Sequence, residues 1–570
     1  MRFQNSRPRN ASALVALIFF VAVNLFAAKK TNVSPTAAPD RGYSANAQNW
    51  PEIPNLEFIT RLRLEEYDHS QVMDIMSHLV DQIGSRLTGS PSMKKANEWT
   101  RDELTRWGLV NSHLEAWGPF GRGWDYQLCE VRMIAPDDMQ FLALPEAWTP
   151  GTNGPLRGEV VQVIATTAAD FDKYRGKLAG KIVLFGEARL PNPSDKPVFN
   201  RATDADLAKT AQFEPSSLAN RPDPATIKRF QFQADTIKFF TDEHVAAVLD
   251  ITRTPGDDGA IQLQAGGYYE KGKTVAFPRV TLSVEHFGRT ARLLAHKVPV
   301  QVELNVETRF YDDDPMSYNT IAEIPGVDPK LKDQVVMLGG HMDSWHASEG
   351  ATDNGVGVGV SMEAVRLLKK LGVQPRRTIR IALWSGEEQG LLGSKGYVKE
   401  HFGSRPISTD PNYQVVPEWL RPTAGPLELK PDQKLISAYF NLDNGPGKIL
   451  GVFLQENAQV RPIFEKWMEP FRDMGMTTLT MRNTYFTDHI AFDDVDIPAF
   501  QFLQDGLDYG LTHHSNQDSY EHLRPDDLKQ AATILAGFVY DAAMCDEMIP
   551  RKPIRPDDPP GKDEKDEEGK

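Results

Sequence analysis

The second half of the chain alternates apolar runs with helical patterns, and this alternation limits the folds open to it. Apolar runs that predict strands occur at residues 335–338, 378–384, 435–442 and 497–502. Helical patterns lie between them, as at residues 358–371. Strands that alternate with helices build a largely parallel sheet with helices on both faces. The sequence therefore predicts an α/β domain with a mostly parallel central sheet covered by helices.

The candidate functional residues follow the expected strands, where ligands bind in open α/β sheets. The four strand ends carry His and Asp, then two Glu, then Asp, then two His. A single acidic residue in such a loop would ordinarily be a solvent-exposed surface residue with no special role. Groups at four strand ends predict one shared site, with a structural metal or a non-catalytic charge network as the alternative.

The residue types indicate the chemistry of this site. The chain of 570 residues has only two cysteines, Cys129 and Cys545, so a metal would be held by His, Asp and Glu. Such ligands without thiolate suit zinc in an open catalytic site. Five ligand groups are too many for one tetrahedral metal with a free position, but they suit two metals if one carboxylate bridges.

Two pairs of neighbouring residues suggest a division of roles. Glu387 and Glu388 are adjacent, which suggests one metal ligand and one general base. Asp343 lies two residues after His341 and is expected to accept the second ring N–H of that histidine. The alternative for Asp343 is a helix or turn cap.

Five motifs, in this order, resemble the co-catalytic di-zinc exopeptidase family of bacterial zinc aminopeptidases and glutamate carboxypeptidases. They are His-Met-Asp-Ser at 341–344, Ala-Thr-Asp-Asn at 351–354, Gly-Glu-Glu-Gln-Gly at 386–390, Asn-Leu-Asp at 441–443 and His-His-Ser-Asn-Gln-Asp at 513–518. The run Gly-Ser-Arg-Leu-Thr-Gly-Ser at 84–90 resembles the start of that peptidase domain. The double histidine makes the chain most similar to the plasma glutamate carboxypeptidase (carboxypeptidase Q) group, which includes dipeptidases.

The resemblance implies the zinc-exopeptidase fold with two Zn²⁺ per chain. It implies these roles: His341 and Asp443 hold one zinc, Glu388 and His514 hold the other, Asp353 bridges the two, Glu387 is the base and Asp343 orients His341. It also implies a cis peptide bond between Asp353 and Asn354.

Two further positions keep alternatives open. His513 stands where better-known aminopeptidases of the family carry an oxyanion-stabilising Tyr. It either donates to the oxyanion or packs beside the site. The run Thr487-Asp488-His489 resembles a substrate-side loop of the family, and a helix N-cap is the alternative.

The expected domain boundaries follow changes in sequence texture. Residues 135–305 hold short β-rich runs between Gly- and Pro-containing turns, which predicts a separate β-rich domain. This region resembles the protease-associated insert of many family members. We expect it to shape or lid the cleft, or to support a homodimer. The peptidase domain would then comprise residues 56–134 and 306–548.

The two ends of the chain have other signatures. Residues 1–28 combine a basic start, a short apolar core and small residues, which predicts a secretory signal peptide or, alternatively, an uncleaved membrane anchor. A linker at 29–55 and a disordered acidic tail at 549–570 follow from composition. The expected location is extracytoplasmic, either secreted or periplasmic, where the two cysteines could pair.

These observations predict an exported zinc-dependent exopeptidase, an aminopeptidase or dipeptidase that hydrolyses short peptides through a metal-bound hydroxide and a Glu base. The net charge of −15 argues against a nucleic-acid partner. A carboxypeptidase of the same family is the first alternative. A catalytically silent, receptor-like binding protein is disfavoured because every ligand is present. A glutaminyl cyclase with one zinc is disfavoured by the insert and by the paired ligands.

Overall fold

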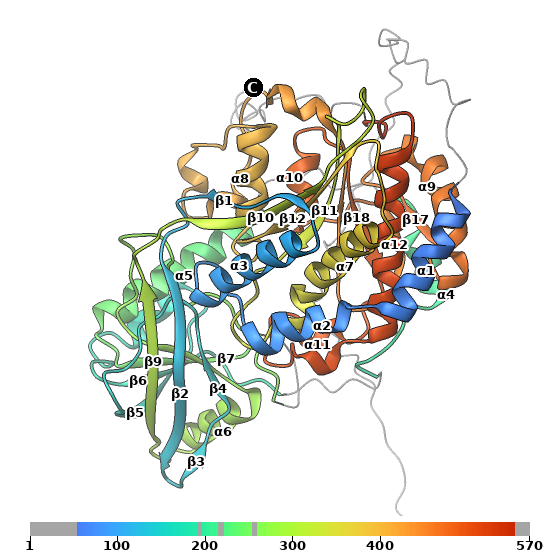
Figure 1. Cartoon of the computed structure of the whole chain (residues 1–570). Coiled ribbons are helices and arrows are strands. Elements are labelled where there is room, and N and C mark those ends of the chain that lie inside the picture. The colour runs from blue at the N-terminus through green and yellow to red at the C-terminus, as the bar shows by residue number, and fades with distance from the viewer. Residues whose placement is uncertain (1–53, 191–196, 215–221, 254–258, 553–570) are drawn as a thin grey trace, which may run out of the picture. The chain divides into compact units, whose positions relative to one another are not determined.

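The computed structural model describes residues 54–190, 197–214, 222–253 and 259–552. These residues form two large sheets with surrounding helices inside one compact unit, Pro51–Lys570 (Figure 1). The expected signal peptide or anchor lies outside the described residues, as do most of the expected linker and tail. In the described ranges, no helix is long and apolar enough to cross a membrane.

The first sheet has eight strands in the order β1-β10-β12-β11-β15-β18-β16-β17. In that order their bounds are Val110–Trp117, Ser317–Ile324, Thr378–Trp384, Val335–His341, Ile436–Asn441, Ala499–Gln504, Ile449–Phe453 and Thr478–Thr480. The four central strands, β12, β11, β15 and β18, are parallel neighbours. They overlap the four apolar runs of the sequence, so the predicted parallel centre of the sheet is confirmed.

The outer strands differ from the expectation of a mostly parallel sheet. β1 pairs with β10, β10 with β12, and β16 with β18, all in antiparallel fashion. For β10 and β16 the reason lies in the short connections to the parallel strands, because a parallel crossover needs about a dozen residues or more. Only residues 442–448 join β15 to β16, so the chain returns antiparallel. The sheet is therefore mixed, with a parallel centre.

Helices cover both faces of this sheet (Figure 1). The consecutive residues Tyr439 and Phe440 of β15 identify the two faces, because side chains alternate along a strand. The Tyr439 ring lies 4.4 Å from that of Phe492 in α10 (His489–Asp493). The Phe440 ring lies 6.2 Å from that of Phe538 in α12 (Pro525–Met544). The site edge of the sheet is thus held between two helical layers.

The remaining helices belong to these layers or to the edges of the sheet. α7 packs beside α12, and α8 contacts α10. The other bounds are α1 (Leu56–His69), α2 (Val72–Ser77), α3 (Pro91–Arg106), α7 (Val356–Lys370), α8 (Leu392–His401), α9 (Arg461–Met468) and α11 (Tyr509–Thr512). Sequence signals explain several ends: α12 begins with Pro525, and the hydroxyl of Ser90 accepts from the backbone N–H of Met93 in α3.

The second sheet has eight strands in the order β3-β2-β9-β5-β6-β7-β8-β4. In that order their bounds are Met139–Gln140, Gly123–Ala135, Gln301–Tyr311, Leu156–Val163, Ile182–Phe185, Ala247–Ile251, Arg279–Leu282 and Ala143–Pro145. The helices of this region are α4 (Asp204–Thr210), α5 (Pro224–Asp242) and α6 (Val284–Ala295). A separate pair, β13 (Gly403–Ser404) and β14 (Glu428–Leu429), follows α8 in the chain.

This second region contains more helix than its sequence texture suggests. Strands β5 to β8 are parallel neighbours. The buried residues of α5 lie only in its last turns, from Thr236 to Phe240, so its helical periodicity is weak in the sequence. The sheet also includes β2 and β9, which pair with each other over most of their length. It therefore begins before and ends after residues 135–305.

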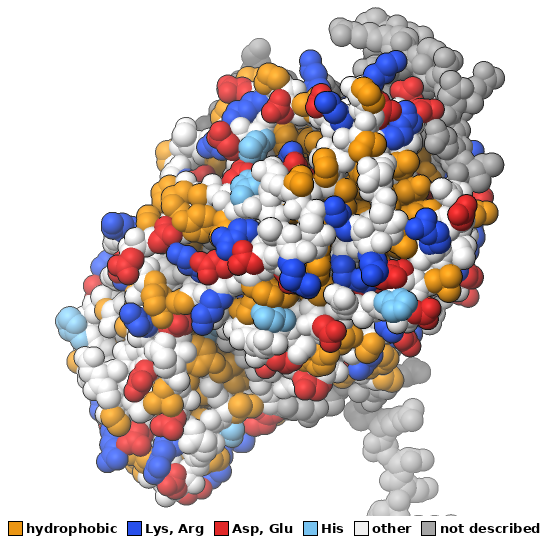
Figure 2. Space-filling view, viewed as in Figure 1, with side chains coloured by type: hydrophobic (Ala, Val, Ile, Leu, Met, Phe, Trp, Pro, Cys, Tyr) orange, Lys and Arg blue, Asp and Glu red, His pale blue; other side chains and the backbone are white. Residues whose placement is uncertain are grey.

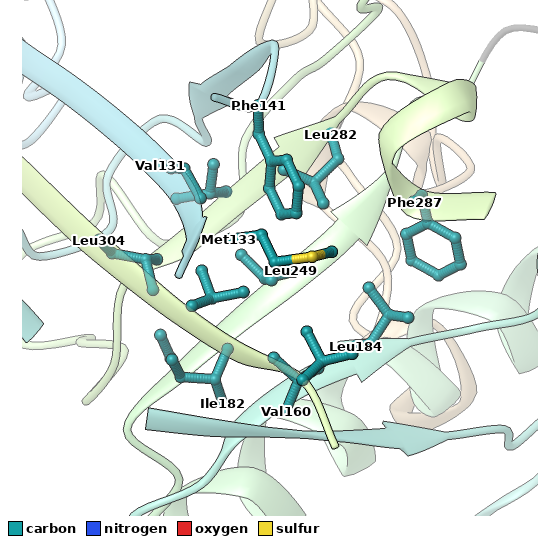
Figure 3. Close-up of a cluster of buried hydrophobic side chains, with 14 of the residues drawn as sticks. Val131, Met133, Phe141, Val160, Ile182, Leu184, Leu249, Leu282, Phe287 and Leu304 are labelled. Atoms are coloured by element: carbon teal, nitrogen blue, oxygen red, sulfur yellow. The ribbon is translucent and has the colours of Figure 1, made fainter. Parts of the chain in front are cut away.

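A dense apolar core fills the second sheet (Figure 3). Met133 of β2, Leu249 of β7, Leu282 of β8 and Phe287 of α6 are all fully buried in it. Cys129 packs against the same core, while Cys545 is buried at the end of α12, and the two form no disulfide in the described structure. This core lies at the centre of the second sheet.

Charged side chains of both signs are spread over the face drawn in Figure 2. Figure 2 shows Asp and Glu (red) interspersed with Lys and Arg (blue) on the face viewed as in Figure 1. The net charge of −15 is therefore not gathered into one acidic patch on this face.

Shortening Leu249 tests the core of the second sheet. Leu249→Ala removes a fully buried side chain, and the cavity should lower the free energy of unfolding by about 2–5 kcal/mol. Urea titration followed by circular dichroism measures this loss. Leu64→Ala on α1 is the matched control. The Leu64 side chain is 58% exposed, so this substitution should change stability by about 0.5 kcal/mol or less. Equal losses in the two variants would contradict the packing described here.

Candidate active site

The carboxyl ends of the four central strands bring the predicted site residues together. His341 ends β11, Glu387 and Glu388 follow β12, and Asp443 follows β15. The remaining predicted residues come from the turns beyond: Asp343 after β11, Asp353 before α7, and His513 and His514 after α11. Because these strands are parallel neighbours, their carboxyl ends lie at one edge of the sheet.

Asp353 lies between two histidines, His341 and His514, that are far apart in the sequence. Its Oδ1 is 3.4 Å from His341 Nε2, and its Oδ2 is 3.1 Å from His514 Nε2. Asp443 Oδ1 approaches the first histidine to 3.2 Å, and Glu388 Oε2 approaches the second to 2.9 Å. The site thus consists of two His-carboxylate clusters that share one carboxylate.

The donor set fits the binding of cations. The ligand atoms of His341, Asp353 and Asp443 lie within 4.8 Å of one another, as do those of Asp353, His513 and His514. Asp353 Oδ2 and Glu388 Oε1 are buried without a hydrogen-bond partner among the described residues. A buried oxygen without a partner is unfavourable, and a cation between these groups would satisfy both.

Burial and charge shift the pKa values of these groups in the protein without a cation. Burial opposes the charged form of His341, but the nearby Asp443 and Glu387 outweigh it and raise the His341 pKa well above its usual value. Burial, with Asp443 and other carboxylates, raises the Glu387 pKa well above its usual value. Burial and Asp353 raise the pKa of Glu388 to about 7. Closely spaced carboxylates at this edge therefore favour positive charge among them.

Residues 319–539, which contain all of these groups, match the model of peptidase family M28. The chain carries an M28 peptidase domain. The resemblance inferred from the sequence motifs is therefore confirmed, and the family indicates a hydrolase that acts on peptide bonds.

Relatives match the chain well beyond the M28 domain. Human carboxypeptidase Q is 27% identical over 475 residues, which cover 83% of this chain and 85% of the relative. An aminopeptidase of Bacillus subtilis is 26% identical over 215 residues, 36% of this chain and 41% of that one. The curated relatives therefore include both a carboxypeptidase and an aminopeptidase by name.

Solved structures share the fold. A peptidase M28 precursor from Shewanella amazonensis superposes with a TM-score of 0.60 at 21% identity and covers 87% of this chain and 99% of its own. A zinc aminopeptidase from Bacillus subtilis superposes with a TM-score of 0.51 at 19% identity. It covers 83% of this chain and 95% of its own. These coverages, 87% and 83% of this chain, extend well beyond residues 319–539 of the M28 domain.

Within the M28 domain, Asp343 connects the ends of two strands. Its carboxylate accepts from the hydroxyl of Thr88 (2.8 Å) and from the backbone N–H groups of Glu387 and Glu388 (3.2 Å each). His341 Nδ1 lies 3.0 Å from the backbone oxygen of Asp343 and 3.5 Å from its carboxylate. The carbonyl is thus the nearer partner of the ring, and the carboxylate holds the Glu-Glu turn.

The turn that presents Asp353 is fixed from two sides. Asp518 accepts from the backbone N–H of Thr352 (2.6 Å) and of Asp353 (3.1 Å). Arg86 is fully buried, and its guanidinium donates to the carbonyls of Met342 (2.7 Å) and Gly350 (2.7 Å). The peptide bond between Asp353 and Asn354 is cis, as the resemblance implied.

The sequence motifs contain these supporting residues but do not indicate what each one contacts. Asp518 ends the double-histidine motif, and Arg86 and Thr88 belong to the run at 84–90, so both motifs flagged them without indicating a role. Arg86 contacts carbonyl groups, which leave no recognisable pattern of side chains. Only the folded chain reveals that contact.

His513 stacks on His514, with ring centroids 3.7 Å apart. Its Nε2 lies 3.6 Å from Asp353 Oδ2, and 42% of its side chain is exposed. Burial and the neighbouring His514 lower the pKa of His513 to about 4. A neutral His513 therefore lines the open side of the site with one ring N–H to donate.

Asp488 and His489 are both fully buried at the start of α10. Asp488 occupies the N-cap position of α10, as the helix-cap alternative expects, although its side chain makes no capping hydrogen bond. Burial raises the pKa of Asp488 to about 7, with further contributions from site carboxylates. Its electrostatic coupling to Glu387 links this loop to the site.

A small pocket opens beside the histidine pair. Its lining includes Asp353, Glu388 and His514 together with Trp345, Ser348 and Asp518. The M28 domain therefore combines a buried carboxylate-histidine cluster with a pocket that reaches it.

Proposed function

We propose that this chain is an exported zinc-dependent exopeptidase, an aminopeptidase or dipeptidase that hydrolyses short peptides. The observation that carries the proposal is the carboxylate of Asp353, whose two oxygens face His341 and His514 in one buried cluster. The M28 family match supports the hydrolysis of peptide bonds. The basic, apolar and small-residue pattern of residues 1–28 supports export.

We propose two zinc ions per chain. His341 and Asp443 would hold one, Glu388 and His514 would hold the other, and Asp353 would bridge them. Imidazole and carboxylate donors without thiolate suit catalytic zinc. When bound, such a pair of metals would polarise a carbonyl and lower the pKa of a bound water toward neutral pH.

Glu387 is proposed as the general base. Its Oε2 lies 3.9 Å from His341 Nε2, beside the cluster, while its backbone N–H is held by Asp343. Its carboxylate would take a proton from the attacking water and deliver it to the nitrogen of the leaving amine. Glu388, the neighbouring carboxylate, faces His514 instead, so the two residues serve different roles.

His513 and the inserted region complete the proposed site. His513 replaces the Tyr of better-known family members, and its ring N–H is a candidate donor to the oxyanion. The region of the second sheet is proposed to be a protease-associated insert that shapes the cleft. Its coverage by the Shewanella and Bacillus structures supports this assignment at the level of the fold.

A carboxypeptidase is the second candidate, favoured by the relatives named carboxypeptidase Q. The metal-binding residues alone do not set the direction of an exopeptidase. A receptor-like protein without catalysis would be expected to lack the base or a ligand, and both are present in this chain.

Replacing the base should separate metal binding from turnover. Glu387→Gln keeps the size of the side chain but removes its basicity, so both zinc ions should remain while kcat falls about 100- to 10,000-fold. Elemental analysis and dipeptide hydrolysis measure the two effects. Glu98→Gln, at an exposed position of α3, is the matched control and should retain activity. Loss of zinc together with activity would mark Glu387 as a ligand and contradict its role.

Blocked substrates test the direction of cleavage. Free dipeptides should be hydrolysed and their N-acetylated forms should not, because the proposed enzyme binds a free amine near the metals. Cleavage of C-amidated forms would then indicate an aminopeptidase, and their resistance a dipeptidase. Cleavage of acetylated but not amidated substrates would contradict the proposal in favour of a carboxypeptidase. Chromatography of the released amino acids measures each rate.

A further inference from the structure

A segment of the inserted region runs along the loop that carries the double histidine. Residues 261–264 and 513–516 lie antiparallel, with a bridge between Gln262 and Ser515. The backbone hydrogen bonds are Leu263 N to His514 O (3.2 Å) and Asn516 N to Ile261 O (3.1 Å). The inserted region therefore contacts the proposed metal site directly.

Buried side chains anchor this segment. Ile261 and Leu263 are 0% and 1% exposed, and they form one apolar cluster with Ala347. His514 itself has a φ of 58°, in the left-handed region that a non-glycine residue adopts only when its surroundings hold it there. The hydrogen bond from Leu263 to the His514 carbonyl supplies part of that support.

Gln264 contacts the ring of His514 on the side away from the carboxylates. Its Nε2 lies 3.2 Å from His514 Nδ1, while His514 Nε2 faces Asp353 and Glu388. Arg253 Nη1 donates to Gln264 Oε1 over 2.6 Å. The arginine thus holds the amide with its NH₂ group toward the ring.

Metal binding demands the opposite amide orientation. A histidine that binds a metal through Nε2 is neutral and carries its hydrogen on Nδ1, so Nδ1 needs an acceptor. The NH₂ group of Gln264 is a donor, whereas its Oε1 is an acceptor. A half-turn about the Cγ–Cδ bond exchanges these two ends without moving the backbone. The contact with Arg253 opposes that rotation.

We propose that Gln264 is a positioning residue for His514, with its amide oxygen accepting from Nδ1–H when Nε2 binds zinc, and that Arg253 favours the opposite orientation. This inference rests on the proposed function. It makes the inserted region a part of the metal site, because one of its side chains sets which ring nitrogen of a proposed ligand is free.

Two substitutions at Gln264 test the proposal through zinc affinity. Gln264→Leu removes the acceptor. The affinity for one of the two zinc ions should fall about 10- to 100-fold, while the other ion stays bound. Gln264→Glu keeps the shape and offers only acceptors, so it should bind both ions at least as tightly as the wild type. Competition titration with a chromogenic chelator measures the dissociation constants of both zinc ions on the full chain, independently of activity.

Two matched variants separate the ring contact from the fit of the loop. Gln262→Leu removes a hydrogen bond to the His513 carbonyl (3.2 Å) but leaves the His514 ring untouched, so zinc affinity should change less than about threefold. Arg253→Ala frees the amide to rotate and should preserve or raise affinity. Weaker binding by Arg253→Ala would overturn its assigned role.

The outcomes at Gln264 are distinct from those of the proposed function. Unchanged affinity in Gln264→Leu, or equal weakening in Gln264→Leu and Gln264→Glu, would overturn the inference alone if the wild type binds two zinc ions. A wild type that binds fewer than two would overturn the proposed function and the inference with it.

Discussion

The contact of one carboxylate with two histidines is the constraint on which the rest of this structure depends. Asp353 can face His341 and His514 at once only if the turn that carries it is held rigidly. Asp518 binds the backbone N–H groups of that turn, and Arg86 binds the carbonyl at its start. Neither contact touches the histidines, yet both fix where the shared carboxylate lies.

The electrostatics of the site follow from burial at the edge of the sheet. Carboxylates from three strand ends lie close together in buried positions, and burial raises the pKa values of Glu387, Glu388 and Asp443. Grouped buried carboxylates destabilise one another unless positive charge lies between them. Arg86 contributes one buried positive charge nearby, through its electrostatic coupling to Asp343 and Asp353. The two histidines and bound cations would supply the remainder.

Sequence reasoning succeeded where local pattern and chemistry coincide. The four apolar runs gave the parallel centre of the sheet, and the polar residues after them lie together in the folded chain. It failed for the outer strands: β10 and β16 run antiparallel because their connections to the parallel strands are short, which periodicity does not reveal. It also missed helix α5, because only its last turns are buried.

Contacts between distant segments were the other limit. Gln264 lies 250 positions from His514, in a region that the sequence marked only as β-rich, and nothing in its neighbours indicates a role at the site. Arg86 likewise acts on carbonyl groups, which every residue carries. Such roles depend on how the chain folds back on itself, so residue types and spacing cannot reveal them.

Anomalous diffraction from crystals of the zinc-loaded protein tests the central claim most directly. The account predicts two zinc peaks about 3.5–4 Å apart, with one oxygen of Asp353 bound to each. His341 and Asp443 should lie at one peak, and Glu388 and His514 at the other. A single peak, or two peaks that Asp353 does not bridge, would contradict it.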